Sequence, residues 1–248
     1  MSVLKQKLLA FGIHLGIGLL VVTGFLLFCW LLVYTPAILG LEGGDRIAFM
    51  ILGVDLALGP MLTFVVYRKG KRELKRDIAI IVAIQVIAFG YGVWTLCTGR
   101  PLYLAYVVEH FQIMTPAEID PDRIRDRRLA PRLIGGPRPV YVARAEGEDV
   151  LRITLEAALG GRDVEHYPEY YRRFDEHLDQ VRERAWTLDR VRRETPAAVE
   201  PIEQAIQRLG RTESELLIVP IVGHAKRAVV LLDRDSGAIL DYVDAVIW

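Results

Sequence analysis

Three long apolar segments, separated by short polar loops, occupy most of the first hundred residues. They cover residues 8–33, 47–67 and 78–96 and are interrupted by a few polar side chains: His14, Thr23, Asp55, Thr63, Gln85, Tyr91 and Thr95. A helix rises about 1.5 Å per residue, so about 20 residues cross a hydrocarbon core of about 30 Å. Each segment reaches that length, and the pattern predicts a bundle of three transmembrane helices within residues 1–99.

The charges of the short loops predict the orientation of these helices. The loop between the second and third segments carries six basic residues: Arg68, Lys69, Lys71, Arg72, Lys75 and Arg76. Lys5 and Lys7 precede the first segment, whereas residues 35–46 carry one basic residue and two acidic ones. The positive-inside rule therefore predicts a cytoplasmic N-terminus and a cytoplasmic basic loop, with everything after Leu96 outside the cytoplasm. The basic loop is explained first by topology alone. The functional alternative is that it binds anionic lipid or a cytoplasmic assembly protein.

The chain after residue 100 has the alternation and spacing of a water-exposed domain. Residues 102–114 are rich in β-branched and aromatic side chains, which predicts a strand leaving the membrane. Residues 115–139 combine prolines and charges without periodicity, which predicts that 100–139 form an exit strand and a linker. Apolar spacing and glycine or proline stops predict helices over 148–159, 170–193 and 197–209.

The C-terminal residues change to the period of strands. Short β-rich runs at 216–222, 228–232 and 239–243 are separated by turn-forming residues, which predicts an antiparallel meander. The predicted fold is therefore a membrane bundle followed by an α+β periplasmic domain, residues 140–248, with a small antiparallel sheet covered by helices.

Composition narrows the function. The chain carries 31 basic and 31 acidic residues. Of these, residues 1–100 hold 10 basic and 5 acidic side chains, and the basic residues form no aromatic-interleaved stripe that would bind nucleic acid. Only Cys29 and Cys97 are present, so the later domain folds without a disulfide. No catalytic motif, cofactor-binding motif or metal-ligand spacing occurs, and we expect neither an enzyme nor a cofactor or metal site.

Asp55 is the acidic residue inside an apolar segment. A carboxylate at that depth costs about 2.5–3.5 kcal/mol on insertion scales, so it should face other helices. We expect a hydrogen bond to Gln85 or Tyr91 that holds the bundle together; a contact with an incoming helix and proton transport are the functional alternatives. Gly59 and Pro60 follow one turn later, where the proline ring removes a helical hydrogen bond and bends the helix, either for packing or as a hinge.

Gly12 and Gly16 form a G-x-x-x-G motif in the first segment. Small residues at this spacing let helix backbones approach closely. The approach would serve the bundle itself, a homodimer or a client helix, and the sequence does not choose among these three.

The second segment resembles a known family. The run Gly53-Val54-Asp55-Leu56-Ala57-Leu58-Gly59-Pro60-Met61-Leu62-Thr63 resembles the second span of type IV pilin accessory proteins (TfpX/TfpZ-like). Further residues resemble that family's basic loop and C-terminal region: Lys71, Leu74, Lys75 and Asp77, the run Pro168-Glu169-Tyr170-Tyr171, residues 217–223 and Trp248.

The resemblance implies a non-enzymatic, chaperone-like accessory role in type IV pilus biogenesis, acting on pilin stability or pilus assembly at the inner membrane. The expected partners are a pilin subunit and the lipid bilayer. From the residues alone, a membrane-tethered periplasmic sensor or scaffold with another client is the alternative.

Overall fold

The computed structural model describes residues 2–30, 36–68, 70, 72–132 and 135–247. These residues form two compact units. Unit 1 consists of residues up to 35 together with Gly43–Thr98. Unit 2 consists of Pro36–Glu42 together with the chain from Gly99 onward, so a short loop between two helices of unit 1 is built into unit 2.

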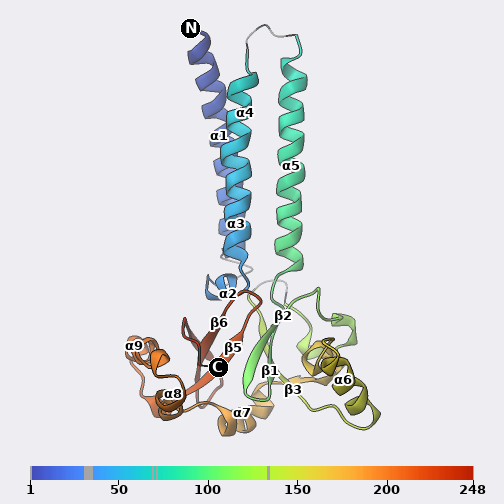
Figure 1. The fold of residues 1–248 in the computed structure, drawn as a ribbon, viewed down its shortest axis with the longest axis vertical. Helices are drawn as coiled ribbons and strands as arrows, with labels where there is room; N and C mark the ends of the chain where they lie inside the picture. The colour runs from blue at the N-terminus through green and yellow to red at the C-terminus, as the bar shows by residue number, and fades with distance from the viewer. Residues whose placement is uncertain (1, 31–35, 69, 71, 133–134, 248) are drawn as a thin grey trace. The chain divides into compact units, whose positions relative to one another are not determined.

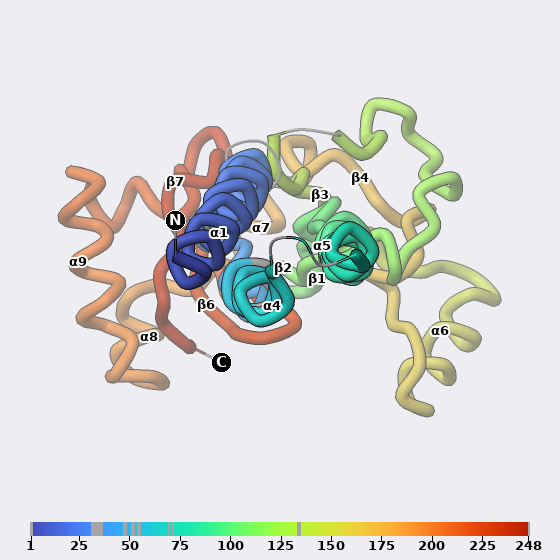
Figure 2. Tube along the Cα trace, turned by 90° about the horizontal axis from the view of Figure 1, so that it is seen from above, coloured from blue at the N-terminus to red at the C-terminus, as the bar shows by residue number. Residues whose placement is uncertain are grey.

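Unit 1 is helical (Figure 1). Its elements are α1 (Val3–Phe28), α3 (Gly44–Gly53), a π-helical turn (Val54–Leu58), α4 (Gly59–Val66) and α5 (Leu74–Thr98). The side chain of Ser2 caps α1 by accepting a hydrogen bond from the Lys5 amide. Both α1 and α5 pack against α4, which lies between them when the unit is viewed along its helices (Figure 2).

Two of these helices, α1 and α5, are long and apolar enough to cross a membrane. Only 6% of the most apolar window of α1, and 11% of that of α5, is buried inside the structure. A core helix of a water-soluble protein would be mostly buried, so these exposed apolar surfaces fit a membrane-anchored protein. The middle apolar segment is not one continuous α-helix, because the π-helical turn separates α3 from α4.

The π-helical turn ends immediately before Gly59 and Pro60. Proline has no backbone N–H, and its ring crowds the carbonyl four residues earlier, so the α-helical ladder is disrupted at this point. The following helix then begins with proline in its first turn, a position where the missing donor is not needed.

Unit 2 is built on a seven-stranded mixed sheet in the order β4-β3-β1-β2-β5-β6-β7. The strands are β1 (Tyr103–Val107), β2 (His110–Met114), β3 (Arg138–Val142), β4 (Tyr171–Arg173), β5 (Leu216–Val222), β6 (Arg227–Asp233) and β7 (Ile239–Val243). The predicted C-terminal antiparallel meander β5-β6-β7 is confirmed. The prediction of a small, purely antiparallel sheet is wrong, because β1 pairs with β3, and β2 with β5, in parallel.

The predicted strand 102–114 is instead a hairpin. β1 and β2 pair in antiparallel fashion, and Val107 lies opposite His110 across a two-residue turn. Val108 in this turn has a φ of 55°, which a β-branched residue rarely adopts. The turn therefore lacks the glycine or asparagine that usually marks such a position, and the sequence reads as one strand.

Residues 115–139, predicted as a linker, lie within unit 2. They form two 3₁₀ turns, Pro121–Arg123 and Arg127–Leu129, and lead into β3. The buried side chains of Ile119 and Leu129 join the core beside β1 and β3. Side-chain caps from Asp120 and Asp126, rather than periodic apolar positions, start the two turns.

The single helix predicted over 170–193 is wrong. The structure has β4, then α7 (Leu178–Arg184) and α8 (Leu188–Glu194), separated where the Trp186 amide donates to the Ile218 carbonyl at 2.8 Å. The Thr187 hydroxyl then caps α8. The apolar periodicity continues through the break because both short helices turn an apolar face toward the core: Leu178 and Val181 in α7, Leu188 and Val191 in α8.

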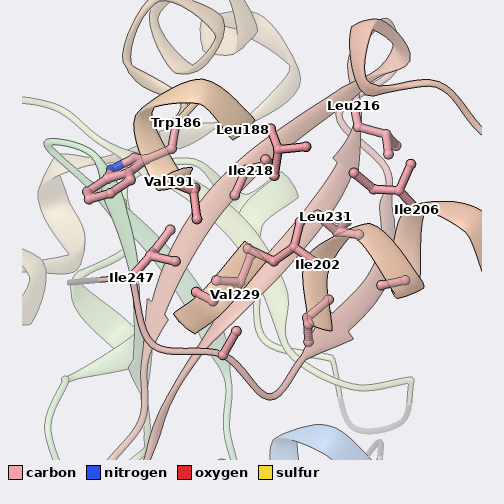
Figure 3. Close-up of a cluster of buried hydrophobic side chains, with 14 residues drawn as sticks. Trp186, Leu188, Val191, Ile202, Ile206, Leu216, Ile218, Val229, Leu231 and Ile247 are labelled. Atoms are coloured by element: carbon pink, nitrogen blue, oxygen red, sulfur yellow. The ribbon is translucent and has the colours of Figure 1, made fainter. Parts of the chain in front are cut away.

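The other predicted helices are confirmed, as α6 (Glu148–Ala158) and α9 (Val199–Leu209). Gly210 ends α9 in the left-handed conformation, with a φ of 63°. The helices α8 and α9 cover one face of β5, β6 and β7, where Val191 and Ile202 pack with Val229 and Leu231 (Figure 3). At the other end of the sheet, α6 packs on the core beside β1 and β3.

Candidate functional site

A groove between α1 and α5 is the candidate functional site of unit 1. It has a volume of about 690 Å³ and is lined mainly by apolar side chains of these two helices. The apolar lining comprises Leu9, Ala10, Ile13, Ile17, Val21 and Val22 of α1 with Ile78, Val82, Val86 and Phe89 of α5. The polar lining residues are Gln6, His14, Thr63, Tyr67 and Gln85.

The groove exists because α1 and α5 both pack on α4 and meet each other mainly near their C-terminal ends. There the rings of Phe25 and Phe89 lie edge to face at a centroid distance of 5.3 Å, beside the buried Val22 and Leu96. Toward its N-terminus α1 diverges from α5 (Figure 1). In that region α1 is held to α4 instead, through the edge-to-face rings of Phe11 and Phe64 at 6.4 Å.

Three polar side chains, which we call the His14 cluster, join the three helices at this groove. His14 Nδ1 lies 2.6 Å from Thr63 Oγ1, and His14 Nε2 lies 2.7 Å from Gln85 Oε1. The amide oxygen of Gln85 accepts a hydrogen bond from Nε2, which leaves Nδ1 of a neutral imidazole to accept one from the Thr63 hydroxyl. Each helix thus contributes one member, and the imidazole links α4 to α5.

Gly59 leaves open the space that the Gln85 amide occupies. A Cβ added at Gly59 would lie 2.1 Å from Nε2 of Gln85, far inside van der Waals contact. Gly59 and Pro60 are both buried in the bundle. The predicted packing residues Gly59, Pro60 and Gln85 therefore lie together, and His14 joins them.

The remaining predicted residues of the membrane segments have different surroundings. The side chain of Asp55 lies outside the described part of the structure. Tyr91 is 60% exposed, and its ring lies 6.0 Å from that of Trp94 on the same helix. At Gly12 and Gly16 an added Cβ would meet no atom within 4 Å, so these glycines do not serve close packing inside unit 1 as described.

Four basic residues of this loop are described, Arg68, Arg72, Lys75 and Arg76, and their side chains are all exposed. Lys69 and Lys71 lie outside the described residues. The exposed positions agree with a solvated loop between the second and third apolar segments.

His14 was not among the site residues predicted from the sequence, although its depth in the first segment was a signal. His14 is the seventh residue of its apolar segment, Gln85 is the eighth of its own, and Thr63 is the fifth from the end of the oppositely directed middle segment. Matching polar residues by depth across antiparallel helices would have brought the three together.

Unit 2 contains a second polar cluster, which we call the His224 cluster. His224 Nδ1 lies 2.7 Å from Glu42 Oε2, and Nε2 lies 2.8 Å from Glu118 Oε1. The hydrogen bonds to Glu118 and Glu42 raise the pKa of His224 to about 10. Burial alone would raise the pKa of Glu118, but its hydrogen bonds from His224 and Thr115 hold that pKa below its ordinary value. Both imidazole nitrogens are therefore protonated donors.

The His224 cluster fastens the short helix α2 (Pro36–Leu41) to the turn between β5 and β6. The Leu41 carbonyl accepts hydrogen bonds from the amides of Ala225 at 2.9 Å and Lys226 at 3.2 Å. A Cβ on Gly223 would lie 2.6 Å from that carbonyl, and Ile38 is fully buried. Within the described residues, no group of three or more His, Cys, Asp or Glu side chains could hold a metal ion, and we interpret this cluster as structural.

Comparisons with known proteins identify relatives of the whole chain. It is 24% identical over 235 residues to the fimbrial assembly protein of serogroup I from Dichelobacter nodosus, with 90% of each chain covered. The serogroup E1 protein of the same organism matches with the same identity and coverage. The protein of serogroups C1 and C2 is 30% identical over 113 residues, which cover 84% of it and 44% of this chain.

No family model matches the chain. No solved structure matches it either. The similarity to the three relatives agrees with the motif resemblance, and the chain belongs to the family of these fimbrial assembly proteins, a type IV pilus-related family.

Proposed function

We propose that this protein is a non-enzymatic accessory factor of type IV pilus assembly that holds the apolar helix of a pilin subunit in the groove between α1 and α5. The names of its relatives support a role in pilus assembly. The groove is the observation that carries the more specific proposal, because it is an apolar, elongated surface between two helices that are themselves fit to cross a membrane.

In this proposal the protein spans the bacterial inner membrane three times. In addition to α1 and α5, the middle segment crosses the membrane as α3, the π-helical turn and α4, with Gly59 and Pro60 buried at the start of α4. A local π-helical adjustment is tolerated in a membrane-spanning helix because it re-satisfies backbone groups that a proline leaves unpaired. The six basic residues between the second and third segments favour a cytoplasmic N-terminus and a periplasmic unit 2.

The physical basis of helix capture inside lipid is packing rather than transfer from water. Lipid tails are as apolar as leucine, so helices associate through close contact and a few polar bonds. The His14 cluster holds α1 and α5 on α4, and the Phe25–Phe89 contact ends the groove on one side. A client helix would then replace lipid in the groove between α1 and α5.

Site-specific photocrosslinking in living cells tests this proposal. A photoreactive phenylalanine analogue replaces Val86, which lines the groove, or its neighbour Ile87, which is 72% exposed but does not line it. Ile17 and Leu20 form the matched pair on α1. We expect pilin to be captured from Val86 and Ile17 and not from Ile87 or Leu20.

Two results would overturn the proposal. Equal capture of pilin from both members of each pair would show a contact unrelated to the groove. Capture of a different protein from the groove positions, unchanged in a strain without pilin, would favour a scaffold with another client.

A further inference from the structure

A polar hollow lies in unit 2, between the turn that joins β1 to β2 and the segment that joins α7 to α8. It has a volume of about 580 Å³, and most of its lining residues are charged or polar. The charged ones are Glu109, Glu183, Arg184, Arg190 and Arg193. A pocket for a small apolar ligand is lined mainly by apolar side chains, so this hollow suits a polar or charged group.

The turn between β1 and β2 holds one of these arginines. Arg184 Nη1 donates to the carbonyl oxygen of Val108 at 3.1 Å. Val108 also lines the hollow, is 63% exposed and has the left-handed φ of 55°. Strained backbone conformations of this kind persist where the surroundings impose them, and they cluster at binding sites. The bond to the Val108 carbonyl keeps the Arg184 guanidinium beside the turn, at the wall of the hollow.

The charge of Arg190 is already balanced inside unit 2. Its Nη1 lies 3.1 Å from Glu109 Oε2, and its Nε lies 3.0 Å from Glu194 Oε1. The guanidinium also lies over the ring of Trp186, 3.7 Å from the ring centroid. Arg190 and Glu109 therefore form part of the wall, and neither carries a charge that a ligand would have to balance.

Arg184 and Arg193 are not balanced in this way. Among the described residues neither forms an ion pair, and the bond to Val108 is the one hydrogen bond that their two side chains make. Glu183, an exposed residue of the lining, likewise has no ion pair within the described part of the chain. Two guanidinium groups against one carboxylate leave the hollow with an excess of positive charge.

A buried donor without an acceptor lies next to this wall. The indole Nε1–H of Trp186, a residue that is 4% exposed, has no hydrogen-bond partner among the described residues. Its ring lies at the margin of the core cluster shown in Figure 3, beneath the Arg190 guanidinium that lines the hollow. This unpaired donor adds to the two unbalanced guanidinium groups, so the region favours a group that brings hydrogen-bond acceptors and negative charge.

We propose that this hollow binds a carboxylate group of a protein partner through Arg184 and Arg193. A guanidinium group donates two parallel hydrogen bonds to a carboxylate, which gives geometric specificity as well as attraction. The single charge of a carboxylate also matches the small excess of positive charge, whereas the larger charge of a phosphate group would be repelled more strongly by Glu183. All of the residues concerned belong to unit 2, so this inference does not depend on the groove of unit 1.

Binding of short peptides to the full-length protein in micelles tests this inference. The chain has 4 tryptophans, and Trp186→Phe identifies which indole signal of the NMR spectrum belongs to Trp186. A tripeptide with blocked ends and a central glutamate should shift that signal until it saturates, and the same peptide with a central glutamine should not. A tripeptide whose carboxylate is its free C-terminus then distinguishes a chain end from an acidic side chain as the bound group.

Three substitutions test the assignment to Arg184 and Arg193. Arg184→Gln should weaken binding of the effective peptide about tenfold or more, because a hydrogen bond between charged groups is lost. Arg193→Gln should weaken it less, since Arg193 is exposed. Arg192→Gln is the matched control and should leave binding unchanged, because Arg192 pairs with Asp189 and Glu203 and does not line the hollow.

Glu183→Gln tests the sign of the electrostatic contribution and should strengthen binding, because it removes the unbalanced carboxylate. Glu183 and Arg193 are exposed, so their variants should keep the melting temperature of the wild type and decide the question even if Arg184→Gln fails to fold. The inference is overturned if neither carboxylate peptide shifts the Trp186 signal or if the glutamine peptide shifts it equally. Tighter binding of inorganic phosphate than of either peptide, or unchanged binding in the folded Arg184→Gln and Arg193→Gln variants, would also overturn it.

Discussion

His14 Nε2 and Gln85 Oε1 lie 2.7 Å apart and join α1 to α5 beside a groove whose lining is otherwise mainly apolar. In a medium that offers no competing water, such a bond holds two helices in a fixed relation. The width of the groove at this level is therefore set by the imidazole and the amide.

A double-mutant cycle measures this relation. His14→Ala and Gln85→Ala should each weaken the bundle, with a coupling energy of about 0.6–1.7 kcal/mol, the range found for hydrogen bonds between transmembrane helices. Unfolding of the purified protein in mixed micelles provides the measurement. Strictly additive effects would show that the two side chains do not act together.

Gly59→Ala should disturb the same place by steric overlap. The added methyl group would lie 2.1 Å from Nε2 of Gln85, so the amide must leave the position in which it bonds to His14. Because the overlap is with the end of the flexible Gln85 side chain, the main cost is the lost hydrogen bond to His14, about 0.5–1.5 kcal/mol. Gly16→Ala is the control in the same micelle assay and should be neutral, because a Cβ there meets nothing within 4 Å. Equal stability of the two variants would contradict the packing described for Gly59.

The His224 cluster should make the stability of unit 2 depend on pH in both directions. The pKa of His224 is raised from 6.5 to about 10, so its contribution is complete below pH 6.5 and is lost as the pH rises toward 10. The pKa of Glu118 is lowered from 4.5, so its contribution is complete above that pH and is lost as the pH falls. Nearly half of the His224 side chain is exposed, which weakens both effects.

Thermal unfolding of the wild type and of His224→Gln across pH 5 to 10 measures this dependence. The wild type should lose more stability than the variant between pH 7 and pH 10. A difference between the two proteins that stays constant over this interval would show that the imidazole is not held in its charged form.

Val108→Gly should stabilise unit 2. The left-handed φ of 55° is costly for a β-branched residue, about 1–3 kcal/mol in such regions, and the side chain is 63% exposed, so little packing is lost. Glycine also costs chain entropy on folding, and we expect a net gain of about 1 kcal/mol at most. The melting temperature of Val108→Gly should therefore lie above that of the wild type. Val107→Gly is a destabilising control, because Val107 is buried in β1.

The strongly periodic parts of the fold were predictable from the sequence, and the long-range pairings were not. Helices α6 and α9 have their expected extents, and Gly210 ends α9 as its position suggests. The break at Trp186 depends on a bond to Ile218, 32 residues away, which no local pattern reports. The turn at Val108 was missed because its sequence lacks the residues that favour its conformation.

The candidate site was predictable in part. Gly59 and Pro60 were predicted from the bend that a proline imposes and Gln85 as a partner of Asp55, and the structure places Gly59 against Gln85, whose amide bonds to His14. His14 could have been predicted only by comparing its depth in the first segment with the depths of Thr63 and Gln85 in the other two, one of which runs in the opposite direction. The groove itself depends on how far α1 lies from α5. The periodicity of a single helix carries no information about its distance from another helix.

The most direct test of the account identifies which part of a pilin reaches the groove. After photocrosslinking from Val86, mass spectrometry of the product maps the captured pilin peptide. The account predicts a peptide from the apolar helix of pilin, and none from the matched position Ile87. A captured peptide from the globular head of pilin, or from a protein other than pilin, would contradict it.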